Sequence, residues 1–170
     1  MKLLREGERL DDLQINGYKV IQNREKFCFG IDAVLLSNFA TVEKGHRVVD
    51  MGTGTGVIPI LLAAKTEAAK IVGVEIQEDM VEMARRSVVL NGLESRIDIV
   101  HGDISKGILE LEGGQWDVVV SNPPYKKYGS GLVNPNSSKA IARHEIMCTL
   151  EDVLRTGARL LKSRGRFFMI

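Results

Sequence analysis

The sequence contains little cysteine, and its cysteines do not form a recognisable site. Cys28 and Cys148 lie far apart and outside any CxxC pair, which argues against a disulfide framework and against a zinc site. The three histidines also lack the spacing of metal ligands. We therefore expect a protein without a bound metal, located in a reducing cytoplasm.

Long hydrophobic runs are lacking as well. The longest apolar stretch, from Val57 to Ala64, is far too short to cross a bilayer. The N-terminal residues Met1 to Glu6 become charged almost at once and contain no apolar signal-peptide core. We expect neither a membrane partner nor a targeting signal.

Net charge is nearly absent, at +1 for 170 residues, so the chain has no general attraction to nucleic acid. Hydrophobic residues make up 44% of the chain and charged residues 26%, which is typical of a single α/β domain of this length. Any binding to nucleic acid must come from local basic clusters, whose simpler interpretation is a solvated surface. The candidates are Lys126-Lys127, Lys139 with Arg143, and Lys162 with Arg164 and Arg166.

The N-terminal part of the sequence indicates a hairpin followed by a helix. Leu13–Ile15 and Tyr18–Ile21 flank Asn16-Gly17, a dipeptide that strongly favours a two-residue hairpin turn. The apolar run Ala33–Ala40 then indicates a helix.

From residue 47 onward, apolar strand-like segments alternate with helical ones. Continuous apolar strands of this kind are typical of a mostly parallel sheet with helices on both faces, a Rossmann-like α/β fold. The expected strands are 47–51, 71–75, 97–100, 116–120 and 166–170; the expected helices are 57–65, 77–90 and 150–162, the last opened by a capping box at Thr149 and ended by Gly165.

The sequence stops within the apolar segment Arg166–Ile170. An open edge strand of this composition is an aggregation hazard that proteins usually cover. We therefore expect that further C-terminal strands of the sheet are missing.

A glycine-rich segment follows the first of the alternating strands, with Asp50, Gly52, Gly54 and Gly56 at every second position. Glycines in a strand-to-helix turn let the backbone approach a ligand closely. The spacing matches neither the GxGxxG dinucleotide fingerprint, because Val57 stands where the pattern would continue, nor a P-loop. A carboxylate beside the glycines would repel phosphate, so a cationic ligand without phosphate, such as S-adenosylmethionine, fits better.

Two more carboxylates are expected at the ends of the next two strands. Glu75 stands where a carboxylate accepts hydrogen bonds from both ribose hydroxyls, and Asp103 stands within reach of the adenine amine. Each feature has a structural alternative, because carboxylates and glycine turns are common at strand ends. Together they predict a cofactor site beyond the carboxyl edge of the sheet.

Phe29 and Gly30 precede the first helix and are expected to form part of a lid over the methionine end of the cofactor. The alternative is an ordinary helix start, with Asp32 near the N-cap. We expect residues 1–40 to pack on the cofactor site of a core formed by residues 41–170, in one domain overall.

The segment Ser121–Tyr125, of sequence Ser-Asn-Pro-Pro-Tyr, ends the fourth strand and predicts the chemistry. Asn122 Oδ1 and the Pro123 carbonyl can each accept one N–H of a flat amine, which directs the nitrogen lone pair toward a methyl donor. Tyr125 offers a face on which a base can stack. Asn122 is also expected to contact the cofactor, and catalysis needs positioning and electrostatics rather than a metal. The alternative is a rigid structural turn.

These motifs resemble those of the class I S-adenosylmethionine-dependent methyltransferases, and Asn122-Pro123-Pro124-Tyr125 resembles the motif of the branch that methylates amino groups. The segments Gly17–Asn23, Phe27–Leu36 and Ala142–Glu145 further resemble bacterial tRNA1(Val) adenine-N6 methyltransferases. The resemblance covers nearly the whole chain from Leu13 onward, except that the family normally continues past the fifth strand.

The resemblance implies methyl transfer from S-adenosylmethionine to N6 of adenine 37, next to the anticodon of a tRNA, with S-adenosylhomocysteine as product. The partner would be RNA, with no obligate protein partner. Basic residues in the stretch after the catalytic turn suit an RNA backbone, although a merely flexible surface loop is nearly as good an interpretation. The residues expected to bind substrate are Pro124, Tyr125, Lys126, Lys127, Lys139 and Arg143.

Other functions remain open at this point. The same motif grips a glutamine side-chain amide in release-factor methyltransferases, although those enzymes usually resemble a longer chain with a helical N-terminal domain. DNA adenine and ribosomal guanine methyltransferases share the motif's chemistry. A cofactor-binding module without catalytic activity is the alternative from a different class.

Overall fold

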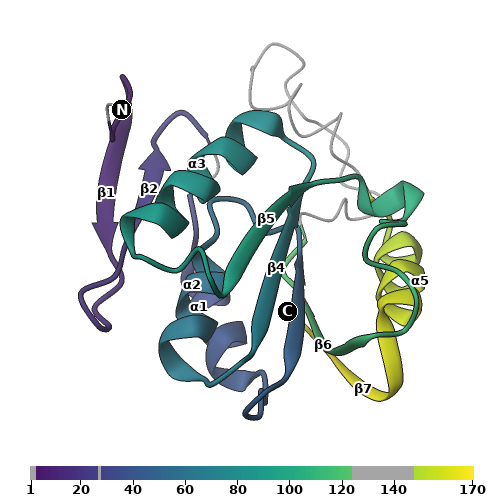
Figure 1. Cartoon of the computed structure of the whole chain (residues 1–170). Helices are drawn as coiled ribbons and strands as arrows, with labels where there is room; N and C mark the ends of the chain where they lie inside the picture. The colour runs from purple at the N-terminus through teal and green to yellow at the C-terminus, as the bar shows by residue number, and fades with distance from the viewer. Residues whose placement is uncertain (1–2, 27, 124–147) are drawn as a thin grey trace.

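The computed structural model of the chain describes residues 3–26, 28–123 and 148–170 (Figure 1). Its main element is a five-stranded sheet in which all neighbouring strands are parallel. The strands are β3 (Arg47–Met51), β4 (Lys70–Glu75), β5 (Ile97–His101), β6 (Trp116–Ser121) and β7 (Leu161–Met169), in the spatial order β5-β4-β3-β6-β7. The predicted Rossmann-like arrangement is confirmed.

Helices cover both faces of this sheet (Figure 1). One face carries α1 (Ile31–Phe39), α2 (Val57–Lys65) and α3 (Glu78–Leu90), and the other carries α5 (Leu150–Leu160) and the 3₁₀ helix η1 (Ile104–Lys106). No helix within the described residues is long and apolar enough to cross a bilayer.

Two buried clusters hold the layers together, one on each side of the sheet. Val48 and Ile71 pack toward α1, α2 and α3, whereas Val49 and Val72 pack toward α5. Successive side chains of a strand point to opposite faces, so strands buried on both sides need apolar residues at nearly every position. This explains the continuous apolar runs of the sequence.

The N-terminal hairpin consists of β1 (Glu8–Asp12) and β2 (Lys19–Asn23) and lies beside α3 (Figure 1). Its turn falls at Asn16 and Gly17, as predicted, and both residues have positive φ angles, of 52° and 70°. Positive φ at both central positions is the geometry that an Asn-Gly hairpin turn favours.

The first hairpin strand ends earlier than the sequence indicates. Leu13–Ile15 was expected in the strand, but the pairing stops at Asp12. Gln14 has a φ of 57°, and its N–H donates to the Asp12 carboxylate at 2.7 Å. This local Asp turn interrupts the extended backbone that a strand requires.

Helix α3 covers the free edge of β2. Ser87 Oγ accepts a hydrogen bond from the Ile21 N–H at 3.0 Å, and the Asn91 side chain bonds both the N–H and the carbonyl of Lys19, at 2.9 and 2.7 Å. The helix side chains therefore satisfy backbone groups that an open strand edge would leave unpaired.

The last helix is shorter than predicted. Its capping box, Thr149 with Asp152, is confirmed, but the helix ends at Leu160 and β7 begins at the next residue. The prediction that Gly165 ends the helix was wrong. Instead, β7 changes register against β6, and Arg164 has a φ of 67°.

The strand order reverses between β3 and β6, and ligands of such sheets bind at the carboxyl ends of the strands on either side of that reversal. Ser121 Oγ donates a hydrogen bond of 2.7 Å to the Met51 carbonyl, which ties the ends of the two strands together. The glycine-rich loop and the Asn122-Pro123 segment both start from this point.

Candidate active site

The glycine-rich loop connects β3 to α2 in a left-handed conformation. Gly52, Gly54 and Gly56 have φ angles of 79°, 57° and 83°, which residues with a side chain rarely adopt. A Cβ atom at Gly52 would meet nothing within 4 Å, so open space lies in front of the backbone there. The loop backbone is therefore accessible at Gly52, and the predicted close approach of a ligand stays a prediction.

Gly73 supports this loop from β4, although the sequence pattern did not single it out. A Cβ atom at Gly73 would lie 2.7 Å from Thr53 Oγ1 and 2.9 Å from Ile99 Cδ1, closer than real Cβ contacts. Thr53 therefore packs directly on the backbone of β4. A lone glycine in a strand signals such an approach, but the sequence does not say what approaches.

Glu75 holds the loop from the end of β4. Its side chain is buried, and Oε2 accepts a hydrogen bond of 2.9 Å from the Gly54 N–H, while Oε1 accepts from Ile76 and Gln77 N–H at 3.0 Å. The carboxylate is thus prealigned at the glycine loop. Its predicted contact with ribose hydroxyls stays a prediction.

Asp50, the last residue but one of β3, is fully buried. Within the part of the chain that the structure describes, neither carboxylate oxygen has a hydrogen-bond partner, and neither does Thr53 Oγ1. Burial raises the pKa of Asp50 to about 7; the nearby Thr53 hydroxyl lowers the pKa in part, and the charge of Glu75 adds to the increase. A buried carboxylate without a partner is costly, which suits a site that is completed by a cationic ligand.

Asp103 lies after β5 and caps η1. Its Oδ1 accepts hydrogen bonds from the N–H and hydroxyl of Ser105, at 2.9 and 2.7 Å, and Oδ2 lies 3.2 Å from Lys106 Nζ. Burial acts to raise the pKa of Asp103, but the bonds from Ser105 and Lys106 outweigh it and hold the pKa below its ordinary value. Asp103 therefore has a structural role here, and its predicted contact with adenine stays a prediction.

Asn122 and Pro123 follow β6 at the strand-order reversal. Asn122 is half-buried and Pro123 is buried. Among the described residues, the Asn122 side chain forms no hydrogen bond, and its predicted contacts with the substrate amine and the cofactor stay predictions. The predicted site residues Pro124, Tyr125, Lys126, Lys127, Lys139 and Arg143 lie outside the described residues.

Phe29 and Gly30 lead into α1, and Gly30 is its N-cap. The Phe29 N–H donates to Gln22 Oε1 at 3.3 Å, and Gln22 Nε2 donates to Thr55 Oγ1 in the glycine-rich loop at 2.7 Å. Gln22 links the predicted lid to the predicted cofactor loop, and the sequence reasoning missed it. The signal was a polar residue within the apolar run Val20-Ile21-Gln22.

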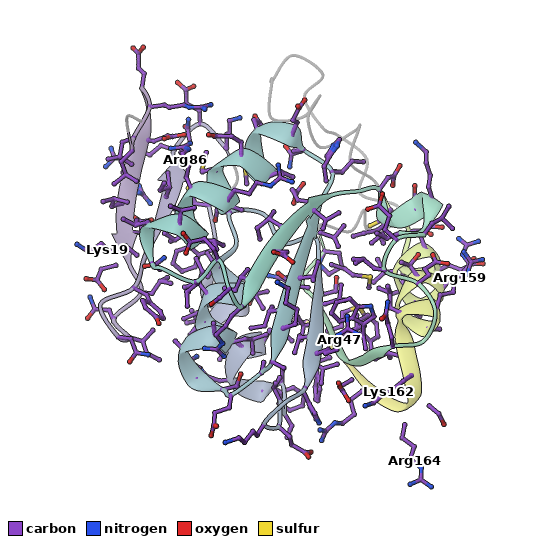
Figure 2. The ribbon with its side chains drawn as sticks, viewed as in Figure 1. Lys19, Arg47, Arg86, Arg159, Lys162 and Arg164 are labelled. Carbon is purple, nitrogen blue, oxygen red and sulfur yellow. The ribbon has the colours of Figure 1, made fainter. Side chains whose placement is uncertain are left out.

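The C-terminal basic cluster lies at the other end of the sheet. Lys162 pairs with Asp117, and Arg166 Nη2 lies 2.7 Å from Glu43 Oε1. Figure 2 shows Arg47, Lys162 and Arg164 together at the amino ends of the strands. This cluster is therefore remote from Asn122 and partly neutralised.

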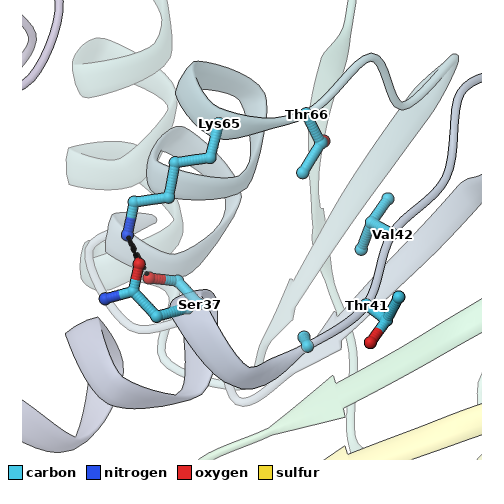
Figure 3. A pocket seen from close by; sticks show the side chains of 7 residues that line it. Ser37, Thr41, Val42, Lys65 and Thr66 are labelled. Carbon is cyan, nitrogen blue, oxygen red and sulfur yellow. Dashed lines mark hydrogen bonds between the residues drawn. The ribbon is translucent and has the colours of Figure 1, made fainter.

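A hollow of about 450 Å³ also lies away from the glycine loop, near the segments that lead into β3 and β4 (Figure 3). Lys65 Nζ donates to Ser37 Oγ at 3.0 Å and to Asn38 Oδ1 at 2.8 Å within it. Burial lowers the pKa of Lys65. Since Lys65 already bonds two partners of α1, we interpret this hollow as part of the packing between α1 and α2.

Comparison with known proteins identifies a family. The family described as the methyltransferase small domain matches residues 24–170. A tRNA1(Val) (adenine(37)-N6)-methyltransferase from Bacteroides thetaiotaomicron is 36% identical over 142 residues, and the protein of that name from Porphyromonas gingivalis ATCC 33277 is 37% identical over 147 residues. Each alignment covers 83% of this chain but 58% and 57% of the relative, so the chain spans less than two thirds of their length.

Solved structures share the fold. A predicted O-methyltransferase from Agrobacterium tumefaciens has a TM-score of 0.62 at 26% identity, covering 81% of this chain and 60% of that protein. A methyltransferase from Thiobacillus denitrificans, solved in complex with S-adenosyl-L-homocysteine, has a TM-score of 0.58 at 18% identity, covering 83% of this chain and 48% of that protein.

Proposed function

The chain belongs to the methyltransferase small domain family, and from this premise we propose that it transfers a methyl group from S-adenosylmethionine to N6 of an adenine in RNA. The proposed substrate is a tRNA and the proposed base is adenine 37, next to the anticodon. The names of the curated relatives support this choice of base and polymer. Such a substrate implies a cytoplasmic protein.

One observation carries the proposal. At the strand-order reversal, the buried carboxylate of Asp50, which has no hydrogen-bond partner among the described residues, lies with the glycine loop and the Asn122-Pro123 segment. S-adenosylmethionine carries a positive charge and no phosphate, so a buried carboxylate and an open glycine backbone fit it. Asp50, Gly52, Gly54, Gly56 and Glu75 would hold it, with Phe29, Gly30, Asp103 and Asn122 as further proposed contacts.

S-adenosylmethionine, when bound, supplies a methyl group that is activated by the sulfonium. The chain's own task is to prepare the nitrogen that receives it. Asn122 Oδ1 and the Pro123 carbonyl accept the two N–H bonds of the adenine amine, which directs its lone pair away from the ring. Tyr125 stacks on the base, and an unpaired anticodon-loop base is cheap to present in this way. The proposed contacts to the RNA are Pro124, Lys126, Lys127, Lys139 and Arg143.

Transfer of a labelled methyl group tests this function. The chain is incubated with labelled S-adenosylmethionine and with either unmodified tRNA or unmodified release factor, followed by nucleoside and amino-acid analysis. We expect N6-methyladenosine in tRNA. Label in glutamine would assign the chain to the protein methyltransferases. A chain that binds the cofactor but labels neither substrate would contradict the proposal.

A further inference from the structure

Gln22 is a fully buried polar side chain in the hairpin strand β2. Its neighbours Val20 and Ile21 are also fully buried. The amide makes two hydrogen bonds and both leave the hairpin: one reaches Thr55, between two glycines of the cofactor loop, and the other reaches the backbone of Phe29. One side chain thus joins two segments that are 26 positions apart in sequence.

The orientation of this amide is determined by its partners. The Phe29 backbone N–H can only donate, so the amide oxygen must face it, and the amide NH₂ must face the Thr55 hydroxyl. An amide meets both demands without a charge, which would be costly at a fully buried position. A carboxylate or an ammonium group could not replace the amide, because each would bring a charge into a fully buried position and neither offers both a donor and an acceptor.

The segment between β2 and α1 is held at further points. Lys26 pairs with Asp79 in the first turn of α3, and Cys28 Sγ lies 3.4 Å from the Asn23 carbonyl. These contacts, however, do not reach the glycine loop. Among the described residues, Gln22 is the side chain whose hydrogen bonds connect this segment with that loop.

We propose that Gln22 is a positioning residue of the cofactor site, which holds the glycine loop through Thr55 and the lid segment through Phe29 in one relative placement. This inference rests on the proposed function and deepens it, because it means that the N-terminal hairpin contributes to the affinity for the cofactor. The purely structural alternative is that Gln22 only helps to attach the hairpin to the core.

Ser87 provides a matched control for that alternative. It is fully buried, and its hydroxyl bonds the N–H of Ile21, the residue next to Gln22, at 3.0 Å. Ser87→Ala therefore removes a buried bond that attaches the same strand, but not one that leads to the glycine loop.

The experiment measures the Kd of S-adenosylhomocysteine by calorimetry and the unfolding temperature without ligand for each variant. We expect Gln22→Met and Thr55→Val each to raise the Kd by about tenfold. The double variant should have a Kd no higher than that of the single variant that binds more weakly, because both substitutions remove the same hydrogen bond. Ser87→Ala should lower the unfolding temperature and leave the Kd within about twofold.

Hydrogen exchange at the Phe29 amide gives a second readout that needs no ligand. The exchange rate should increase in Gln22→Met and stay unchanged in Ser87→Ala. If Gln22→Met does not fold, the Kd of Thr55→Val still tests the proposal, because that variant removes the same hydrogen bond from the other side. A wild-type chain that binds no S-adenosylhomocysteine would overturn the proposed function and this inference with it. A wild-type chain that binds, with Gln22→Met and Thr55→Val binding equally well, would overturn the inference alone.

Discussion

Asp50 shows most directly how one residue joins stability to function. Its side chain is fully buried and has no hydrogen-bond partner in the described part of the chain, which destabilises the fold, and the ionised form is the more costly one. Its pKa is raised from 3.8 to about 7, so the folded chain keeps a proton that the unfolded chain has released. The contribution of Asp50 to the free energy of unfolding therefore falls as pH rises from 3.8 to about 7 and stays low above that.

Replacement of Asp50 by asparagine should therefore stabilise the ligand-free chain at pH 8. We expect the free energy of unfolding to rise by roughly 1–3 kcal/mol, because the buried charge is lost. The same change should weaken binding of S-adenosylmethionine. Urea unfolding at pH 8 and pH 5 tests this, with pH 5 as the control, where Asp50 is already protonated. Equal or lower stability of Asp50→Asn at pH 8 would contradict the pKa assignment.

In our proposal Asn122 positions the adenine amine for transfer and makes only one of several contacts with the cofactor. Asn122→Ala should abolish methyl transfer, because the acceptor for the adenine amine is gone, and should leave the Kd of S-adenosylmethionine within a few-fold. Single-turnover transfer to tRNA and calorimetry measure the two quantities separately. A variant that transferred methyl groups at a near-normal rate would refute the proposed mechanism.

At the scale of elements, the hairpin is attached to α3 by a buried ion pair between Glu8 and Arg86; Figure 2 shows Arg86 on α3, facing the hairpin. Arg86 bonds both carboxylate oxygens of Glu8, at 2.6 and 2.7 Å, and their side chains are 5% and 4% exposed. Arg86 also bonds the Leu3 carbonyl at 2.6 Å and the more exposed Glu82. The hydrogen bond from Arg86 holds the pKa of Glu8 below its ordinary value.

Removal of one member of this pair should cost more than removal of an exposed partner. We expect Arg86→Ala to lower the free energy of unfolding by about 3 kcal/mol, because the nearly unexposed Glu8 carboxylate then keeps only the bond from the Arg5 N–H. Glu82→Gln, at a side chain that is 36% exposed, should cost under about 1 kcal/mol. Because the pKa of Glu8 is lowered, the pair's contribution should be lost as pH falls below 4.5.

Urea unfolding of both variants at pH 7 measures this difference, and repeating it at acid pH checks its sign. If Arg86→Ala and Glu82→Gln had the same free energy of unfolding at neutral pH, the buried pair would not be what stabilises the attachment of the hairpin to α3.

At the scale of the whole molecule, the cofactor loop, Glu75 and Asn122 come from three neighbouring strand ends of one sheet. A ligand that spans them should stabilise the fold as a unit. At a hundredfold excess over its Kd, S-adenosylhomocysteine should add about 2.7 kcal/mol and raise the unfolding temperature by roughly 5–10 °C. Asn122→Ala should show nearly the full increase. An unfolding temperature that does not respond to the ligand would contradict a cofactor site at this edge.

Most of the fold could be predicted from local pattern. The bounds of α2 and of β3 match the predicted segments, because apolar period and capping signals are set by neighbours in the sequence. The ends of β1 and α5 could not be predicted in this way. The φ angle of Gln14 and the register change of β7 depend on contacts with the turn and with β6.

The sequence by itself determined which chemical groups are available: it places carboxylates, glycines and the Asn122-Pro123 turn after particular strands, in a particular order. The tertiary structure alone decided two further facts: Asp50 is buried with no hydrogen-bond partner among the described residues, and Gln22 bonds Thr55 and Phe29. The physical reason is range. Backbone conformation and periodicity are local properties, whereas desolvation and hydrogen-bond partnership depend on residues that only folding brings together.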